Sequence, residues 1–337
     1  CCCVPAPQFR PPRLLQSCPR EPFPEWPPTW KGPRSGVLFH EGPAHSSKVL
    51  YGNVIWDGAL SLAKFFAWCD RCGPALGTAG IRGRHRADGP RRGRVGEAPC
   101  GPVRGQSCLE LGAGVGVVGL TLGRLGAREV VITDNEPEVV ELARRNISSN
   151  GLEANVAART LDWANVATYL PVGSRGGGPF DLVVAADVLY DGDGQLFAQA
   201  LQAHLPSGSS SVGYVSNHHS PARCDATLGF LRTMFDAGFS VERLEDESGR
   251  AVGSLCISGR GGSLGAHGQT EEIFRGSRFV ALDQQEGLEA VRNASFRFGG
   301  ESPMQRIQIF RFRRTTASRG GPGSTEGTGA TATRSML

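Results

Sequence analysis

Three glycines at alternate positions follow a short apolar segment near the middle of the chain. Gly112, Gly114 and Gly116 lie between the apolar run 107–111 and a run with helical periodicity. Glycines at such a junction let the backbone approach a ligand closely and present the free N–H groups at the start of a helix. The pattern therefore predicts a ligand-binding turn, although a tight strand-to-helix turn without a ligand has the same pattern.

Two acidic residues flank this turn and narrow the choice of ligand. Glu110 immediately precedes the Leu111-Gly112 pair, and Asp134 ends the next apolar run, 134 − 112 = 22 residues after Gly112. An acid at that distance reaches the ribose hydroxyls of a bound nucleoside. A dinucleotide fits less well, because the G-x-G-x-x-G spacing is imperfect and Glu110 would face a pyrophosphate. The amino group and sulfonium of S-adenosylmethionine suit a nearby acid, so this cofactor is favoured.

Alternating apolar runs and helical segments position these residues. Such alternation predicts a parallel, doubly wound α/β sheet, and runs that are apolar throughout predict strands covered on both faces. The predicted strands are 107–111, 129–134, 154–163, 180–190, 210–217 and 304–314, and the predicted helices are 117–126, 137–149, 194–205 and 225–237.

Composition divides the rest of the chain. The 337 residues include 47 Gly and 22 Pro, a surplus that predicts long irregular segments around a smaller folded core. The predicted organisation is a disordered Pro-rich segment (1–36), a strand and a helix packing on the core (37–70), a disordered Arg/Gly-rich insertion (71–106), the core with a Gly-rich insertion (107–314, insertion 246–304) and a disordered tail (315–337).

Four sequence blocks carry a resemblance to a known family. They are VIWDGALSLAKFF (54–66), LELGAGVGVVGL (109–120), LDW (161–163) and FDLVVAADVLYD (180–191). Together they resemble the seven-β-strand protein-lysine methyltransferases of methyltransferase family 16, of the methyltransferase-like 21 type. The last block contains Asp187-Val-Leu-Tyr190, the D-x-x-Y signature of this group. The resemblance implies a single-domain, Rossmann-like class I methyltransferase with a mostly parallel seven-stranded sheet.

The resemblance also implies a cofactor site for S-adenosylmethionine. The glycine turn and the acid before it would line the methionine end of the cofactor, and other residues would hold its ribose and adenine or cover it. The implied positions are Glu110, Gly112, Gly114 and Gly116 at the methionine end, Asp134 at the ribose, Asp162 and Trp163 at the adenine, Trp56 over the cofactor and Ala186 beside the reaction centre.

Asp187 and Tyr190 are the implied catalytic pair, facing an incoming lysine of a protein substrate. Methyl transfer from a sulfonium needs a neutral amine, whereas free lysine has a pKa of about 10.4 and is almost entirely protonated at neutral pH. A carboxylate can bind and orient the arriving ammonium, and a tyrosine can stack against it. Alignment would then supply most of the acceleration. His218 and His219 follow the predicted strand 210–217 and could touch substrate at the same edge, although two adjacent histidines on a loop are usually solvated.

Other functions are left open by the residues alone. The acceptor could be histidine, arginine or a small molecule, and a non-catalytic interaction protein could retain the fold. The formal charge of +4 does not favour nucleic acid as a partner, and no apolar run is long enough for a membrane helix. Cys69-x-x-Cys72 lacks a second pair, so no metal is predicted. Because residues 1–20 lack an apolar segment, we expect a cytoplasmic protein, with the nucleus or an organelle as alternatives. We also expect a monomer.

Overall fold

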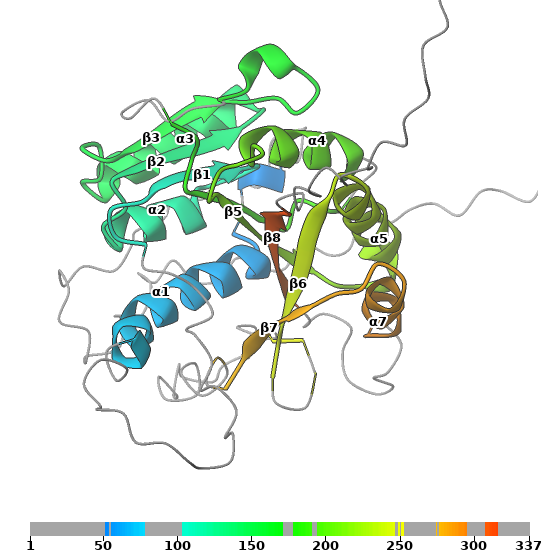
Figure 1. Cartoon of the computed structure of the whole chain (residues 1–337). Helices are drawn as coiled ribbons and strands as arrows, with labels where there is room; N and C mark the ends of the chain where they lie inside the picture. Colours follow the sequence, from blue (N-terminus) through cyan, green and yellow to red (C-terminus); the bar gives the residue numbers. More distant parts are fainter. Residues whose placement is uncertain are drawn as a thin grey trace, which may run out of the picture.

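One eight-stranded sheet organises the described part of the chain (Figure 1). The computed structural model describes residues 51–53, 55–77, 103–170, 178–190, 194–246, 249, 251–252, 274, 276–294 and 307–315. The strand order is β3-β2-β1-β4-β5-β8-β6-β7, in which β1 to β5 are parallel and the last three are antiparallel to their neighbours. The strands are β1 (Ser107–Leu111), β2 (Glu129–Asp134), β3 (Val156–Thr160), β4 (Leu182–Ala186), β5 (Val212–His218), β6 (Phe239–Glu245), β7 (Arg278–Ala281) and β8 (Ile307–Arg314).

Helices cover both faces of the sheet, as the doubly wound prediction requires. Alternate residues of one strand point to opposite faces: Cys108 of β1 packs in one apolar cluster, and Leu109 and Leu111 pack in another. The first cluster includes α1, α2 and α3, and the second includes α4, α5 and α7. The helices are α1 (Asp57–Gly77), α2 (Val117–Arg124), α3 (Pro137–Ser149), α4 (Gly194–His204), α5 (Pro221–Asp236) and α7 (Glu286–Ala294), with single 3₁₀ turns η1 (Tyr51–Asn53) and η3 (Val166–Thr168).

The sheet has one strand more than the seven predicted. Strand β7 and helix α7 both lie inside 246–304, where an irregular Gly-rich insertion was expected, so that expectation is wrong for residues 278–294. Strand β7 pairs with the edge strand β6, and Phe279 packs against Phe65 with ring centroids 5.9 Å apart. A four-residue strand whose burial comes from a distant helix carries no local sequence signal.

The helical spacing of apolar residues after Asp57 predicts Asp57 as the N-cap, whereas helix α1 already includes Asp57 as its first residue. It continues to Gly77, seven residues beyond the expected boundary at residue 70. The strand expected before it is absent from the described residues there, where Tyr51–Asn53 forms a 3₁₀ turn. Gly52 packs against Val139 and Gly114 instead of a sheet edge. Of the segments predicted to be disordered, 1–36, 71–106 and 315–337, residues 71–77 are helical, and residues 1–36, 78–102 and 316–337 lie outside the described residues.

An aromatic cluster docks α1 on the sheet, although the long segment 78–102 separates this helix from β1. Phe65 is fully buried, and its ring centroid lies 6.0 Å from that of Tyr214 on β5 and 5.6 Å from that of Phe274. This packing holds the first turn of α1 against the ends of β4 and β5. Within the described ranges, no helix is both long and apolar enough to cross a bilayer.

Candidate functional site

The candidate residues gather at the carboxyl ends of the parallel strands. Strands β1, β2, β4 and β5 all end at this edge, and the chain order reverses between β1 and β4. In doubly wound sheets, ligands bind at this edge where the strand order reverses. The glycine turn after β1, the end of β2 and the segment after β4 therefore meet where a ligand site is expected.

The glycine turn adopts a backbone that favours glycine. Gly112 and Gly114 have φ angles of 62° and 57°, in the left-handed region that residues with a side chain rarely adopt. A Cβ on Gly112 would lie 2.9 Å from both Trp163 Cζ2 and Val188 Cγ1, and one on Gly114 would lie 2.9 Å from the Gly52 carbonyl oxygen. Trp163, Val188 and Gly52 thus close around the turn from three distant parts of the chain.

The Asp134 carboxylate links the end of β2 to this turn. It accepts hydrogen bonds from the backbone N–H groups of Gly114 (3.0 Å) and Glu136 (3.2 Å). Burial raises the pKa of this carboxyl, and the same backbone donors partly offset the rise. The predicted ribose-binding acid therefore lies directly beside the glycine turn.

Glu110 has a position that the sequence did not reveal. Its side chain is buried, and its carboxyl oxygen Oε2 accepts a hydrogen bond of 2.7 Å from the N–H of Gly119, in the first turn of α2. The residue before α2, Gly116, has no side chain to cap the helix, so Glu110 satisfies one of the free N–H groups that every helix start leaves. Burial raises the pKa of this carboxyl to about 8. Its direct contact with the cofactor stays a prediction.

Trp163 reaches the turn from the loop after β3. Its ring packs against Gly112 and lies 5.2 Å, between centroids, from Phe197 of α4. The carbonyl oxygen of Trp163 accepts a hydrogen bond of 2.8 Å from the Tyr169 hydroxyl. The neighbouring Asp162 side chain accepts a hydrogen bond from Ala164 N–H (2.9 Å), which shapes the loop. Trp163 thus adjoins the turn and Asp162 precedes it in the same loop, and the contact of both residues with adenine stays a prediction.

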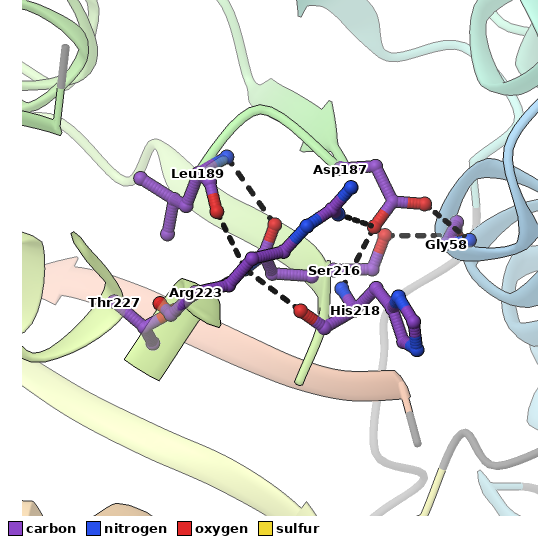
Figure 2. Close-up of polar contacts among 8 residues, drawn as sticks. Gly58, Asp187, Leu189, Ser216, His218, Arg223 and Thr227 are labelled. Carbon is purple, nitrogen blue, oxygen red and sulfur yellow. Dashed lines mark hydrogen bonds and ion pairs between the residues drawn. The ribbon is translucent and has the colours of Figure 1, made fainter. Parts of the chain in front are cut away.

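Asp187 lies at the end of β4 with its side chain turned inward. Its φ of 55° is the one positive φ among the described non-glycine residues, a conformation that persists where surrounding contacts hold it. The carboxylate accepts hydrogen bonds from Gly58 N–H (2.6 Å) and His218 N–H (2.7 Å), and it lies 3.4 Å from Arg223 Nη1 (Figure 2). With 2% of its side chain exposed, Asp187 joins α1, β5 and α5.

The Asp187 carboxylate is also the cap of helix α1. The carbonyl oxygen of Trp56 accepts the first helical hydrogen bonds, so Asp57 is the first helical residue and not the N-cap that was expected. The next N–H, that of Gly58, is satisfied by Asp187, and the Gly58 carbonyl accepts a hydrogen bond from Ser216 Oγ (2.8 Å). A Cβ on Gly58 would lie 2.5 Å from the carboxylate, so this approach requires glycine.

The solvent side of this sheet edge is completed by Trp56, Tyr190 and Arg223. Tyr190 is 47% exposed, one of the two exposed large apolar side chains among the described residues. The guanidinium carbon of Arg223 lies 5.7 Å from the Trp56 ring centroid and 6.0 Å from the Tyr190 centroid. Trp56 and Tyr190 therefore flank one arginine, which the sequence did not single out among the 33 in the chain.

Asn217 fixes the segment between Asp187 and Tyr190. Its buried side-chain amide accepts a hydrogen bond from Leu189 N–H (3.2 Å) and donates to the Leu189 carbonyl (3.3 Å) and to Thr227 Oγ1 (3.2 Å). Ala186 pairs with Ser216 in the sheet directly before this segment. A polar residue at the end of the apolar run 210–217 is the sequence signal that could have identified Asn217.

The two histidines after β5 differ from the solvated pair that was expected. His219 is buried, with 4% of its surface exposed. His218 ends β5, and its backbone N–H holds the Asp187 carboxylate. His218 therefore supports the site through its backbone.

The chain is similar to curated proteins that are named as lysine methyltransferases. A family model described as lysine methyltransferase matches residues 45–220. The protein N-lysine methyltransferase METTL21A of Mus musculus is 35% identical over 148 residues, which cover 42% of this chain and 61% of that protein. The protein N-terminal and lysine N-methyltransferase EFM7 of Gibberella zeae is 24% identical over 160 residues, covering 43% and 60%. A calmodulin-lysine N-methyltransferase of Arabidopsis thaliana is 30% identical over 140 residues, covering 40% and 43%. The chain thus spans about three fifths of the length of the first two relatives.

Proposed function

Because the match over residues 45–220 takes in just over half of the chain, the chain belongs to the lysine methyltransferase family, and we propose that it transfers a methyl group from S-adenosylmethionine to a lysine side chain of another protein. One observation carries the proposal: the predicted cofactor turn touches the predicted acceptor segment. Val188, between Asp187 and Tyr190, packs directly against Gly112. A cofactor seated on the turn would therefore lie beside a substrate bound at Tyr190.

The residues at the turn fit S-adenosylmethionine. The absent side chains of Gly112 and Gly114 leave backbone free to approach a ligand, and the Asp134 carboxylate beside them suits two ribose hydroxyls. Trp163 supplies an aromatic surface at the same place. When bound, the cofactor supplies an electrophilic methyl group on a sulfonium. Asp134 would hold the ribose, Asp162 and Trp163 the adenine, and the turn backbone the methionine end.

On the acceptor side, the chain provides aromatic surfaces and a carboxylate that suit an amine. Tyr190 and Trp56 flank one position, and the Asp187 carboxylate lies at its inner end. Aromatic faces attract cations, so a lysine ammonium would be drawn to this position and oriented there. Asp187, whose oxygens already accept two backbone hydrogen bonds, would act mainly by holding the segment that presents Tyr190.

Cofactor binding is tested by calorimetry with the full chain. Wild type should give saturable heat with S-adenosylmethionine, and Asp134→Asn should weaken the affinity about tenfold, the usual scale for one charged hydrogen bond. Glu138→Gln, which changes an exposed acid in the first turn of α3, should bind like wild type. A folded wild-type protein without saturable heat would overturn the proposal.

The acceptor is tested by incubating the protein with methyl-labelled cofactor and a cell extract. We expect label on lysine side chains of a protein, located by mass spectrometry. Because EFM7 is named for N-terminal as well as lysine methylation, the spectra must separate α-amino from side-chain methylation. Label found only on histidine, arginine, nucleic acid or small molecules would contradict the lysine assignment and leave the cofactor result standing.

A further inference from the structure

We propose that Arg223 is a resident cation in the acceptor position, which the substrate's ammonium must displace. The inference rests on the proposed function and deepens it, since it assigns a residue that sets how strongly the acceptor is bound. Arg223 lies in the first turn of α5 and reaches back over the end of β4. Figure 2 shows its side chain directed at the Asp187 carboxylate.

Three groups that attract cations converge on this guanidinium. Arg223 Nη1 lies 3.4 Å from Asp187 Oδ1, and its Cζ lies 5.7 Å and 6.0 Å from the Trp56 and Tyr190 centroids. A carboxylate with two aromatic faces is the arrangement that binds an ammonium ion. Trp56 and Tyr190 come from segments more than a hundred residues apart, so the fold assembles this position and places the chain's own cation in it.

Each contact of Arg223 is weak for its kind. The Asp187 contact is single and long, because that carboxylate already accepts shorter bonds from Gly58 N–H (2.6 Å) and His218 N–H (2.7 Å). Both ring distances lie at the outer limit of about 6 Å for a cation–aromatic attraction. The side chain keeps 17% of its surface exposed. The guanidinium can therefore leave toward water without breaking a close pair.

Arg311 on β8 shows what a fixed arginine looks like in the same protein. Its Nε and Nη2 donate to the two oxygens of Glu242 at 2.7 Å each, and its Cζ lies 4.1 Å from the Phe279 centroid. Two parallel charged hydrogen bonds give a strong, directional pair. Arg223 has neither the paired bonds nor the close ring.

A lysine ammonium cannot share the position with the guanidinium, because two like charges there repel each other. Val188 contacts Gly112, so this position adjoins the cofactor turn. Substrate binding therefore requires Arg223 to move out, and the lost contacts reduce the substrate's apparent affinity. Removing the guanidinium should leave Asp187 in place, since its two backbone bonds remain.

The direct test uses n-butylammonium as a probe of the lysine side chain. Its binding to the full chain is followed by the NMR signals of the tryptophan indole N–H groups. Arg223→Ala and Arg223→Gln should bind the probe roughly three- to tenfold more tightly than wild type, the scale of one weak ion pair with a cation–aromatic contact. Arg232→Ala removes the same charge from an exposed position of α5 and should bind like wild type, as should Arg223→Lys.

Unchanged or weaker binding of n-butylammonium by both Arg223→Ala and Arg223→Gln would overturn the inference. Removing an arginine that supports the structure of the site would lower the affinity for the probe. Neutral n-butanol should not gain affinity, and an equal gain would show that space, not charge, was the cause.

A kinetic split gives the second test, using a pool of synthetic peptides with one lysine each and labelled cofactor. Arg223→Ala should lower the KM for the pool three- to tenfold and leave kcat within twofold of wild type. A fall in kcat with unchanged KM would contradict the inference. If wild type labels no peptide or extract protein while n-butylammonium still binds more tightly to Arg223→Ala, the proposed function fails and the resident-cation assignment stands.

Discussion

Replacing Glu110 by glutamine tests the burial of this carboxyl through the pH dependence of stability. The pKa of Glu110 rises from its ordinary value of 4.5 to about 8, chiefly because burial disfavours the charged form. In the unfolded chain the carboxyl ionises near 4.5. Between pH 4.5 and 8 the unfolded state therefore loses a proton that the folded state keeps, so the free energy of unfolding falls as the pH rises.

The size of this effect follows from the same pKa values. Each pH unit between them is worth about 1.4 kcal/mol, so the carboxyl of Glu110 removes up to about 5 kcal/mol of stability by pH 8. This stability is present in full below pH 4.5, where the carboxyl is protonated in both states, and it is lost as the pH rises through 8. Glutamine keeps an acceptor for Gly119 N–H and does not titrate, so Glu110→Gln should escape the loss.

Urea unfolding of both proteins at pH 5, 6, 7, 8 and 9 measures this difference. The free energy of unfolding of Glu110→Gln, minus that of wild type, should rise steadily from pH 5 to 8 and then level off. Taking the difference cancels other groups that titrate in both proteins. Glu138→Gln, at an exposed position, should give no such rise. Parallel curves for Glu110→Gln and wild type would refute the burial argument.

Three further substitutions probe the site. Gly112→Ala should lower stability and cofactor affinity more than Gly151→Ala. Both glycines have a φ of 62°, but only Gly112 has neighbours within 4 Å of an added Cβ. Equal losses for the two variants in thermal unfolding and calorimetry would show that backbone strain is the only cause. Asn217→Ala should cost about 1–3 kcal/mol by leaving Leu189 N–H buried without its partner, measured by urea unfolding, and an unchanged midpoint would contradict this role. Asp187→Asn should speed hydrogen exchange in the first turns of α1, because the asparagine NH₂ group must face the N–H of either Gly58 or His218. Unaltered exchange would show that Asp187 does not cap this helix.

Local signals predicted most of the fold. Pro137 marks the start of α3 and Gly151 follows its end, and both boundaries agree with the structure. The apolar runs at β1 and β4 needed no knowledge of their neighbours, because strands covered on both faces are apolar throughout. Strands β6 and β7 and helix α7 were not predicted. The burial of β7 and α7 depends on β6, α1 and α5, which are distant in sequence.

The sequence predicted which residues form the site, but it did not predict how their side chains are oriented. The glycine turn, Asp134, Trp163 and the segment around Val188 come together, because each follows a parallel strand and all such strands end at one edge. The directions of the Glu110 and Asp187 carboxylates could not be read from spacing, since each is set by a helix N–H that only the tertiary fold brings near.

The long-range capping of α1 has a consequence for how the chain folds during synthesis. Gly58 receives its hydrogen-bond partners from residues 129 and 158 positions later. At about 5–20 residues per second, the ribosome delivers those partners roughly 6 to 30 seconds after Gly58 itself. During that interval the side chains of Phe65 and Phe66, both buried in the finished protein, cannot yet pack against Tyr214 of β5. The capping of helix α1 can thus be completed only after strands β1 to β5 have been translated.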